Sequence, residues 1–133
     1  MVYLTRKAEF SASHFYHNPE FSAEENRSLF GKCNNPNGHG HNYMLEVTVK
    51  GEVNPQSGFV VDLKQLKEVL EREVLSVLDH RFLNKEVPEF GEVIPTTENL
   101  AKLVFEYAKG RGLPVVEVTL WETPYSFATY RPS

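Results

Sequence analysis

Two segments of this chain alternate between apolar and polar side chains with a period of two residues, and each carries histidine at one end. The apolar set of the first segment is Leu4, Ala8, Phe10, Ala12 and His14. That of the second is His39, His41, Tyr43, Leu45, Val47 and Val49. Side chains two residues apart share one face of a strand, so the pattern predicts two half-buried strands. If these strands pair antiparallel, their histidine ends meet.

The sequence after the second strand predicts two helices. Asp62 is a favourable N-cap, and the apolar residues between 63 and 78 recur with helical spacing. Thr96 or Thr97 caps a second helix, which includes Leu100. The turn-rich residues 15–38, by contrast, predict a long loop.

Two further strands are predicted at residues 115–121 and 125–130, and Glu122 continues one apolar parity of the first of them. The expected fold class is therefore α+β, a single domain over residues 1–133 with the order ββααββ. Its two helices would lie on one face of an antiparallel sheet. Four strands cannot close a barrel and would leave open edges, which favours a homo-oligomer.

Composition excludes several classes of function. The net charge is −4 and basic residues form no run, so we expect no nucleic-acid partner. No apolar stretch is long enough to span a membrane, and the start lacks the pattern of a signal peptide. A single cysteine forms no internal disulfide, which suits a reducing compartment. We therefore expect a cytoplasmic protein.

The run from Cys33 to Tyr43 brings one thiol and two histidines close together in the sequence. His39 and His41 project from one face of the predicted strand, and His14 ends the other strand. Three neutral imidazoles with a fourth position open are typical of a catalytic Zn2+ site. Cys33 could then transfer protons beside the metal, because a nearby dication lowers the pKa of a thiol.

Each of these residues also has a purely structural interpretation. A histidine on an apolar face is often a hydrogen-bonded core residue, and a free cysteine often packs as a small hydrophobic side chain. Asp79 and His80 could simply end a helix, where a cation interacts favourably with the helix dipole. Glu122 could be a charge that protects a sheet edge.

Five motifs, taken in order, resemble the family of 6-pyruvoyltetrahydropterin and 6-carboxytetrahydropterin synthases, and the pyruvoyl group most closely. They are Phe10–His14, Cys33–Tyr43, Leu78–His80, Pro95–Asn99 and Glu122–Thr123, and together they span nearly the whole chain. The resemblance implies the tunnelling fold (T-fold), in which trimers form a β-barrel and two trimers stack into a homohexamer. It also implies conversion of 7,8-dihydroneopterin triphosphate to 6-pyruvoyltetrahydropterin with loss of triphosphate.

The same resemblance implies a role for each site residue. The zinc ligands would be His14, His39 and His41, and the base would be Cys33. Asp79 and His80 would complete a proton relay, and because the family's pocket lies between subunits, this relay could serve the Cys33 of a neighbouring subunit. The residues that hold the pterin would be Thr97, Glu98 and Glu122. The triphosphate would need local cations, for which the candidates are Arg6, Lys7, Arg27 and Lys32.

Three functions remain compatible with the sequence. The first is the pyruvoyl enzyme, and the second is the 6-carboxytetrahydropterin synthase of queuosine biosynthesis, which takes the same substrate. The five residues between Cys33 and His39 favour the first, because the cysteine of the second group usually stands closer to the histidine pair. The third is a non-catalytic zinc- or pterin-binding module. Relatives that cleave the side chain carry glutamate in place of Cys33, which ranks that activity low.

Overall fold

A five-stranded sheet with the order β3-β1-β2-β4-β5 organises the computed structural model, which describes residues 1–133. The two long strands are β1 (Val2–His14) and β2 (His39–Gly51), which pair antiparallel over their whole lengths. Next come β4 (Val115–Thr123) and β5 (Ser126–Tyr130), also antiparallel. The short strand β3 (Arg81–Phe82) lies at the other edge, beside β1.

The register of β1 on β2 confirms that the two histidine ends meet. His14 lies opposite His39, and Ala12 lies opposite His41. Phe10 lies opposite Tyr43, and their rings stack with centroids 4.9 Å apart. The alternation in the sequence fixes which side chains face the core, because a slip of one residue would turn every apolar side chain toward the opposite face. The exact register comes from the structure.

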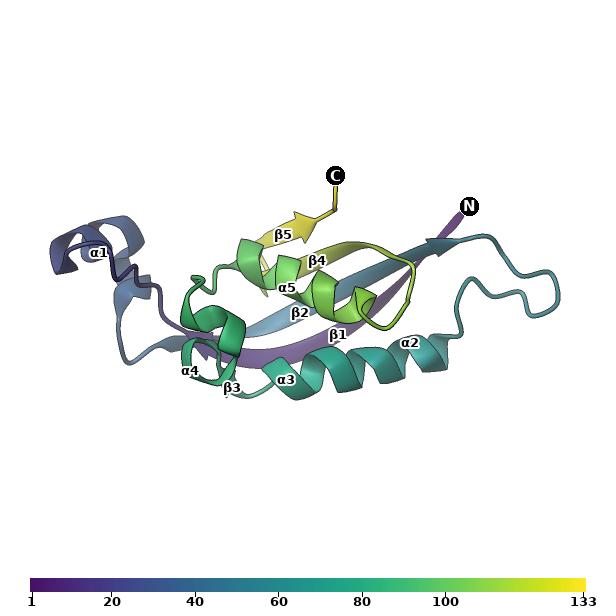
Figure 1. The fold of residues 1–133 in the computed structure, drawn as a ribbon, viewed down its shortest axis with the longest axis horizontal. Coiled ribbons are helices and arrows are strands. Elements are labelled where there is room, and N and C mark those ends of the chain that lie inside the picture. Colours follow the sequence, from purple (N-terminus) through teal and green to yellow (C-terminus); the bar gives the residue numbers. More distant parts are fainter.

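The longer helices cover one face of this sheet and leave the other open (Figure 1). One is α5 (Thr97–Lys109), which is capped by the Thr96 hydroxyl. The other runs from α2 (Leu63–Leu70) through a π-helical turn, η2 (Glu71–Leu75), into α3 (Ser76–Leu78). The Asp62 carboxylate accepts a hydrogen bond from the Lys64 N–H at its start, as the sequence predicts.

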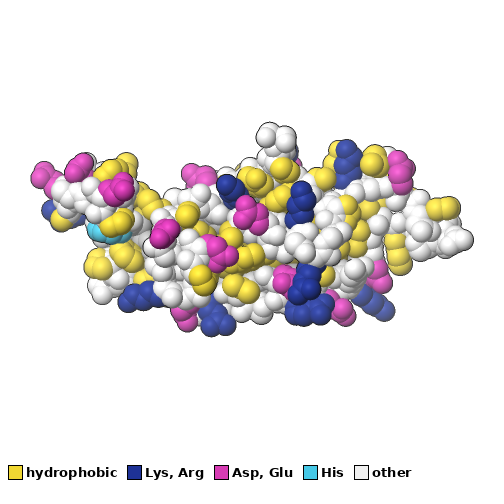
Figure 2. Space-filling model, viewed as in Figure 1, with side chains coloured by type: hydrophobic (Ala, Val, Ile, Leu, Met, Phe, Trp, Pro, Cys, Tyr) yellow, Lys and Arg dark blue, Asp and Glu magenta, His cyan; other side chains and the backbone are white.

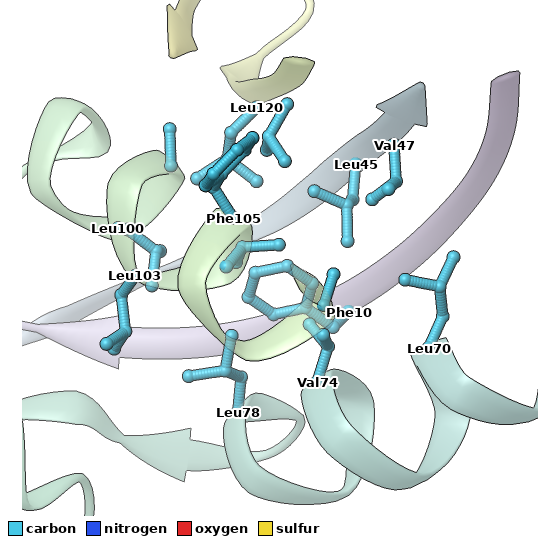
Figure 3. Close-up of a cluster of buried hydrophobic side chains, with 14 of the residues drawn as sticks. Phe10, Leu45, Val47, Leu70, Val74, Leu78, Leu100, Leu103, Phe105 and Leu120 are labelled. Atoms are coloured by element: carbon cyan, nitrogen blue, oxygen red, sulfur yellow. The ribbon is translucent and has the colours of Figure 1, made fainter. Parts of the chain in front are cut away.

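The hydrophobic core lies between the sheet and these helices. Figure 3 shows Phe10 and Leu45 of the sheet facing side chains of both helical segments, among them Val74 and Phe105. The fully buried branched aliphatic residues come from strands and helices alike: Leu45, Val47, Val49, Leu66, Val74, Leu78, Leu83, Leu100, Val104, Val118 and Leu120. Burial of these side chains is the main source of stability.

The prediction of a long loop over residues 15–38 is wrong in part. This segment contains α1 (Ala23–Phe30) and the 3-10 turn η1 (Gly31–Asn34). Ser22 and Glu25 form a capping box at the start of α1, each side chain bonding the backbone of the other. This motif is readable in a sequence, but the surrounding turn-forming residues concealed it.

The predicted ββααββ order is also incomplete. Between Asp79 and Thr96 the chain forms β3, then α4 (Leu83–Glu86) and the 3-10 turn η3 (Pro88–Gly91). Strand β3 runs parallel to β1, so the sheet is mixed rather than antiparallel. Elements of two to four residues carry too little periodicity to be recognised from sequence.

A bulge in β4 changes which residues of this strand face the core. The pairing with β2 skips Val116, and Val115 lies opposite Val49 instead. Val115 is consequently buried, whereas Val116 is only half-buried, so the predicted parity is wrong at its first position. It is confirmed from Val118 onward, which includes Glu122 at the histidine end of the sheet.

The surface carries mixed charges. In Figure 2 acidic and basic side chains are interspersed over the helical face, and several acidic side chains gather on α1 at one end of the molecule. None of the helices is both long and apolar enough to cross a membrane.

Candidate active site

The three predicted ligands, His14, His39 and His41, converge where β1 and β2 end. One ligand atom from each lies within 4.8 Å of those of the other two. The ring centroids of His14 and His39 are 4.8 Å apart, and those of His39 and His41 are 5.1 Å apart. The cross-strand register produces this arrangement, since His14 and His39 pair directly and His41 lies two residues further along β2.

The state of these imidazoles fits a metal ion. His14 is fully buried, and its Nε2 and that of His41 have no hydrogen-bond partner. Burial, followed by repulsion from His39, lowers the pKa of His14 to about 4. Burial also lowers the pKa of His41, although Glu122 opposes this. Neutral imidazoles with a buried, unpaired nitrogen are the form that binds a transition metal.

Two tyrosines, Tyr16 and Tyr43, contact His14, and neither was predicted from the sequence as a site residue. The Tyr43 hydroxyl lies 3.1 Å from His14 Nδ1, which leaves Nε2 free for a ligand. Tyr16 packs its ring against His14, with centroids 4.8 Å apart. Burial raises the pKa of both phenols, so they remain neutral hydrogen-bonding groups. The signal for Tyr43 was its position two residues after His41, on the same face of the strand.

The predicted base, Cys33, lies beside the histidine cluster. Its Sγ is 3.9 Å from His39 Nε2. The thiol is held there by η1, and the Cys33 carbonyl accepts a hydrogen bond of 2.7 Å from the Tyr16 N–H. Burial and the Glu122 carboxylate raise the pKa of this thiol. The protein's own groups therefore favour the protonated form of Cys33. A nearby cation would be needed to lower the pKa and favour the thiolate.

Glu122 connects the histidines to the start of α5. Its Oε1 lies 3.3 Å from His41 Nε2, and its Oε2 accepts a hydrogen bond of 2.6 Å from the Thr97 hydroxyl. The Tyr16 hydroxyl is 3.5 Å from the same oxygen. The side chain keeps 21% of its exposure, so a ligand can reach the carboxylate. Glu98, the next residue of α5, is exposed.

Asp79 and His80 form a pair on a different part of the sheet. Asp79 Oδ1 is 3.0 Å from His80 Nδ1 and also accepts a hydrogen bond from the Ser11 N–H, which lowers the pKa of Asp79. Both side chains line a groove of about 770 Å³ on the open face, with Ser11 and Asn42. Neither forms a hydrogen bond or ion pair with Cys33 or the histidines. The one-chain structure thus does not bring the whole predicted set together.

The candidate cations are dispersed. Lys7 lines the open-face groove together with acidic Glu9, whereas Arg6 lies near Lys67 and Glu71. Arg27 and Lys32, which are both exposed, lie in the α1–η1 segment that holds Cys33. These last two are the cations on the same segment as the thiol.

Comparisons with known proteins agree with this geometry. The family model described as 6-pyruvoyl tetrahydropterin synthase matches residues 3–133. Proteins named 6-pyruvoyl tetrahydrobiopterin synthase from Poecilia reticulata and Homo sapiens are each 44% identical, covering 97% and 96% of this chain and 89% and 90% of their own lengths. A solved structure of Caenorhabditis elegans 6-pyruvoyl tetrahydropterin synthase superposes with a TM-score of 0.94 at 43% identity, covering 99% of this chain and 96% of that one. The chain belongs to the 6-pyruvoyl tetrahydropterin synthase family.

Proposed function

We propose that this protein is the lyase that converts 7,8-dihydroneopterin triphosphate to 6-pyruvoyltetrahydropterin and releases triphosphate. The observation that carries the proposal is a thiol, Cys33, 3.9 Å from the nearest of three converging histidines. A metal-binding module without catalysis would need the histidines but would have no use for the thiol. Family membership and 44% identity to the human synthase over nearly the full length support the same activity.

We propose Zn2+ as the metal, held by His14, His39 and His41. Three imidazole ligands would leave room at the ion for substrate oxygens, as in catalytic zinc sites. Bound zinc would supply Lewis-acid polarisation of the substrate hydroxyls, which makes the adjacent C–H protons more acidic. The Tyr43 hydroxyl would keep the His14 ring in the orientation in which Nε2 binds the ion.

The protein residues then divide the remaining work. Cys33 removes a carbon-bound proton from the substrate side chain and returns one later in the reaction. Glu122 holds the pterin, because a carboxylate can accept two parallel hydrogen bonds from the amine and ring N–H edge. Thr97 orients Glu122 through its 2.6 Å hydrogen bond, and the exposed Glu98, the next residue of α5, would help to hold the pterin.

The second half of the proton relay comes, we infer, from a neighbouring subunit. Asp79 and His80 lie together on the open sheet face, apart from the Cys33 of their own chain. The bare face and the free edge of β5 are suited to contacts with further copies. A homohexamer built as a dimer of trimers would bring the pair of one copy to the thiol of another. A free catalytic thiol also requires a reducing compartment, which supports a cytoplasmic location.

Product analysis tests the activity. The purified, zinc-loaded protein is incubated with 7,8-dihydroneopterin triphosphate, and the pterin is identified by mass spectrometry. We expect the pyruvoyl side chain and one triphosphate per turnover. A carboxyl side chain with release of acetaldehyde would assign the protein to the 6-carboxytetrahydropterin synthases. Absence of turnover with zinc bound would leave only the binding module.

Mixed oligomers test whether the site spans two subunits. Cys33→Ala and His80→Ala chains are each expected to be inactive alone. Co-expression should restore part of the activity, because some interfaces then combine an intact thiol with an intact histidine. If both residues act within one chain, the mixture stays inactive.

A further inference from the structure

The segment that carries the Asp79–His80 pair is fastened along the edge of β1. The Asp79 carboxylate accepts from the Ser11 N–H at 2.9 Å, and the His80 N–H donates to the Ser11 carbonyl at 2.6 Å. His80 adopts a left-handed backbone conformation with φ 61° there, which is unfavourable for a residue with a side chain. Strand β3 follows and pairs in parallel with Ala12 and Ser13.

The last fastening is made by a side chain rather than by the backbone. Asn84, in α4, accepts a hydrogen bond from the Phe15 N–H through Oδ1 at 2.9 Å. Its Nδ2 donates to the Phe15 carbonyl at 2.8 Å. A side-chain amide carries a donor and an acceptor in one plane, so Asn84 replaces the peptide group of a neighbouring strand.

Phe15 immediately follows His14, the last residue of β1 and the most buried of the three proposed ligands. The pairing of β1 with β2 ends at His14 and His39, so the sheet no longer holds the peptide of Phe15. The Phe15 N–H belongs to the peptide bond between His14 and Phe15, so holding its direction holds the ψ angle of His14. The backbone from which the His14 ring projects is thereby fixed. Asn84 supplies both hydrogen bonds that the sheet does not.

We infer that Asn84 is a positioning residue for the metal centre. It fixes the backbone that follows His14 and thereby holds the imidazole in the geometry that the other two ligands require. Because α4 directly follows β3, the same contact also joins the Asp79–His80 segment to the metal end of β1. This inference rests on the metal centre of the proposed function, and Asn84 itself touches none of the three imidazoles by hydrogen bond.

Zinc affinity measures the role directly. The purified oligomer is titrated with Zn2+ in competition with a chromophoric chelator, and the Co2+-loaded protein is examined by visible absorption, which reports on ligand geometry. Asn84→Ala should weaken zinc binding by at least about tenfold, the usual effect of losing a group that orients a ligand. Asn84→Asp keeps the acceptor for the Phe15 N–H and should recover part of this affinity.

Asn54→Ala is the matched control. Asn54 Oδ1 also accepts two backbone hydrogen bonds, from Gln56 and Ser57, in the turn at the opposite end of the sheet from α4 (Figure 1). Its loss should leave the zinc affinity and the cobalt spectrum at the wild-type values. An equal loss of affinity in this control would overturn the inference, because it would then reflect general destabilisation.

The other outcomes separate the inference from the proposed activity. Wild-type affinity and spectrum in Asn84→Ala, or no recovery in Asn84→Asp, would overturn the positioning role while leaving the enzyme intact. A wild-type protein that binds zinc without turnover refutes the activity alone. A wild-type protein that binds no zinc refutes both.

Discussion

Replacing Glu122 with Gln tests the pterin anchor most sharply. The carboxylate accepts from Thr97 through Oε2, and Oε1 faces His41 Nε2 without a hydrogen bond to it. A carboxylate bound to an N–H edge makes two charge-assisted hydrogen bonds, each contributing about 1.5–3 kcal/mol. Glutamine retains one neutral bond of about 1 kcal/mol and presents an N–H to a donor, so the net loss is about 3 kcal/mol. This corresponds to an increase in Kd of about 100-fold.

The assay is equilibrium binding of 7,8-dihydroneopterin to the zinc-loaded protein, followed by calorimetry, with zinc content measured in parallel. Glu73→Gln is the matched control, because Glu73 is also half-buried and accepts a 2.8 Å hydrogen bond, from Arg111, in the helical turn η2 outside the open-face groove. It should bind dihydroneopterin with the wild-type Kd. Unchanged affinity in Glu122→Gln with normal zinc content would remove Glu122 from the pocket. A loss of zinc together with pterin affinity would mean that the carboxylate acts through the metal centre.

Three further predictions follow from the same structure. Cys33→Ala should lower kcat by about 10²–10⁴-fold, the usual contribution of a general base, while zinc content stays near wild type; loss of zinc would identify the thiol as a ligand. In the metal-free protein, burial lowers the pKa of His14 to about 4, from about 6.5 in the unfolded chain. Neutral His14 therefore contributes stability that is fully present above pH 6.5 and is lost as the pH falls toward 4. Urea unfolding of wild type and His14→Asn should show their difference in stability changing by about 3 kcal/mol over this window, and parallel curves would contradict the shift. Gly38 has φ +74°, and a Cβ there would lie 3.2 Å from the His14 carbonyl oxygen. Gly38→Ala should therefore destabilise the protein by about 1–3 kcal/mol and lower its Tm. An unchanged Tm would show that the turn relaxes without cost.

The convergence of the three histidines could be anticipated because it follows from the alternation within two strands and from their pairing. His39 and His41 are separated by one residue on a strand, and both strands carry their histidines on the apolar face, so pairing the strands brings the rings together. The caps at Asp62 and Thr96 were equally readable, since each depends on residues within one helical turn. The capping box of Ser22 and Glu25 also lies within one helical turn, but it is surrounded by turn-forming residues that favour a loop.

Contacts between segments far apart in the chain could not be predicted from the sequence. Asn84 reaches Phe15 across 69 residues, and Tyr16 reaches Glu122 across 106 residues. Neither contact leaves a periodic pattern, because each depends on a single side chain whose direction is set by the packing around it. The bulge at Val116 is similar, since it appears only when β4 is laid against β2.

By itself, the sequence determined the faces of the two long strands, the starts of the two longer helices, the convergence of the three histidines and the family. All of these follow from alternation, capping and short motifs, which act over a few residues. The tertiary structure alone decided that Tyr43 supports His14, that Glu122 bonds Thr97, and that Asp79 and His80 lie on the open face away from Cys33. The physical reason is that a hydrogen bond between two separate elements forms only when packing brings their side chains together. No periodic pattern in the local sequence records that packing.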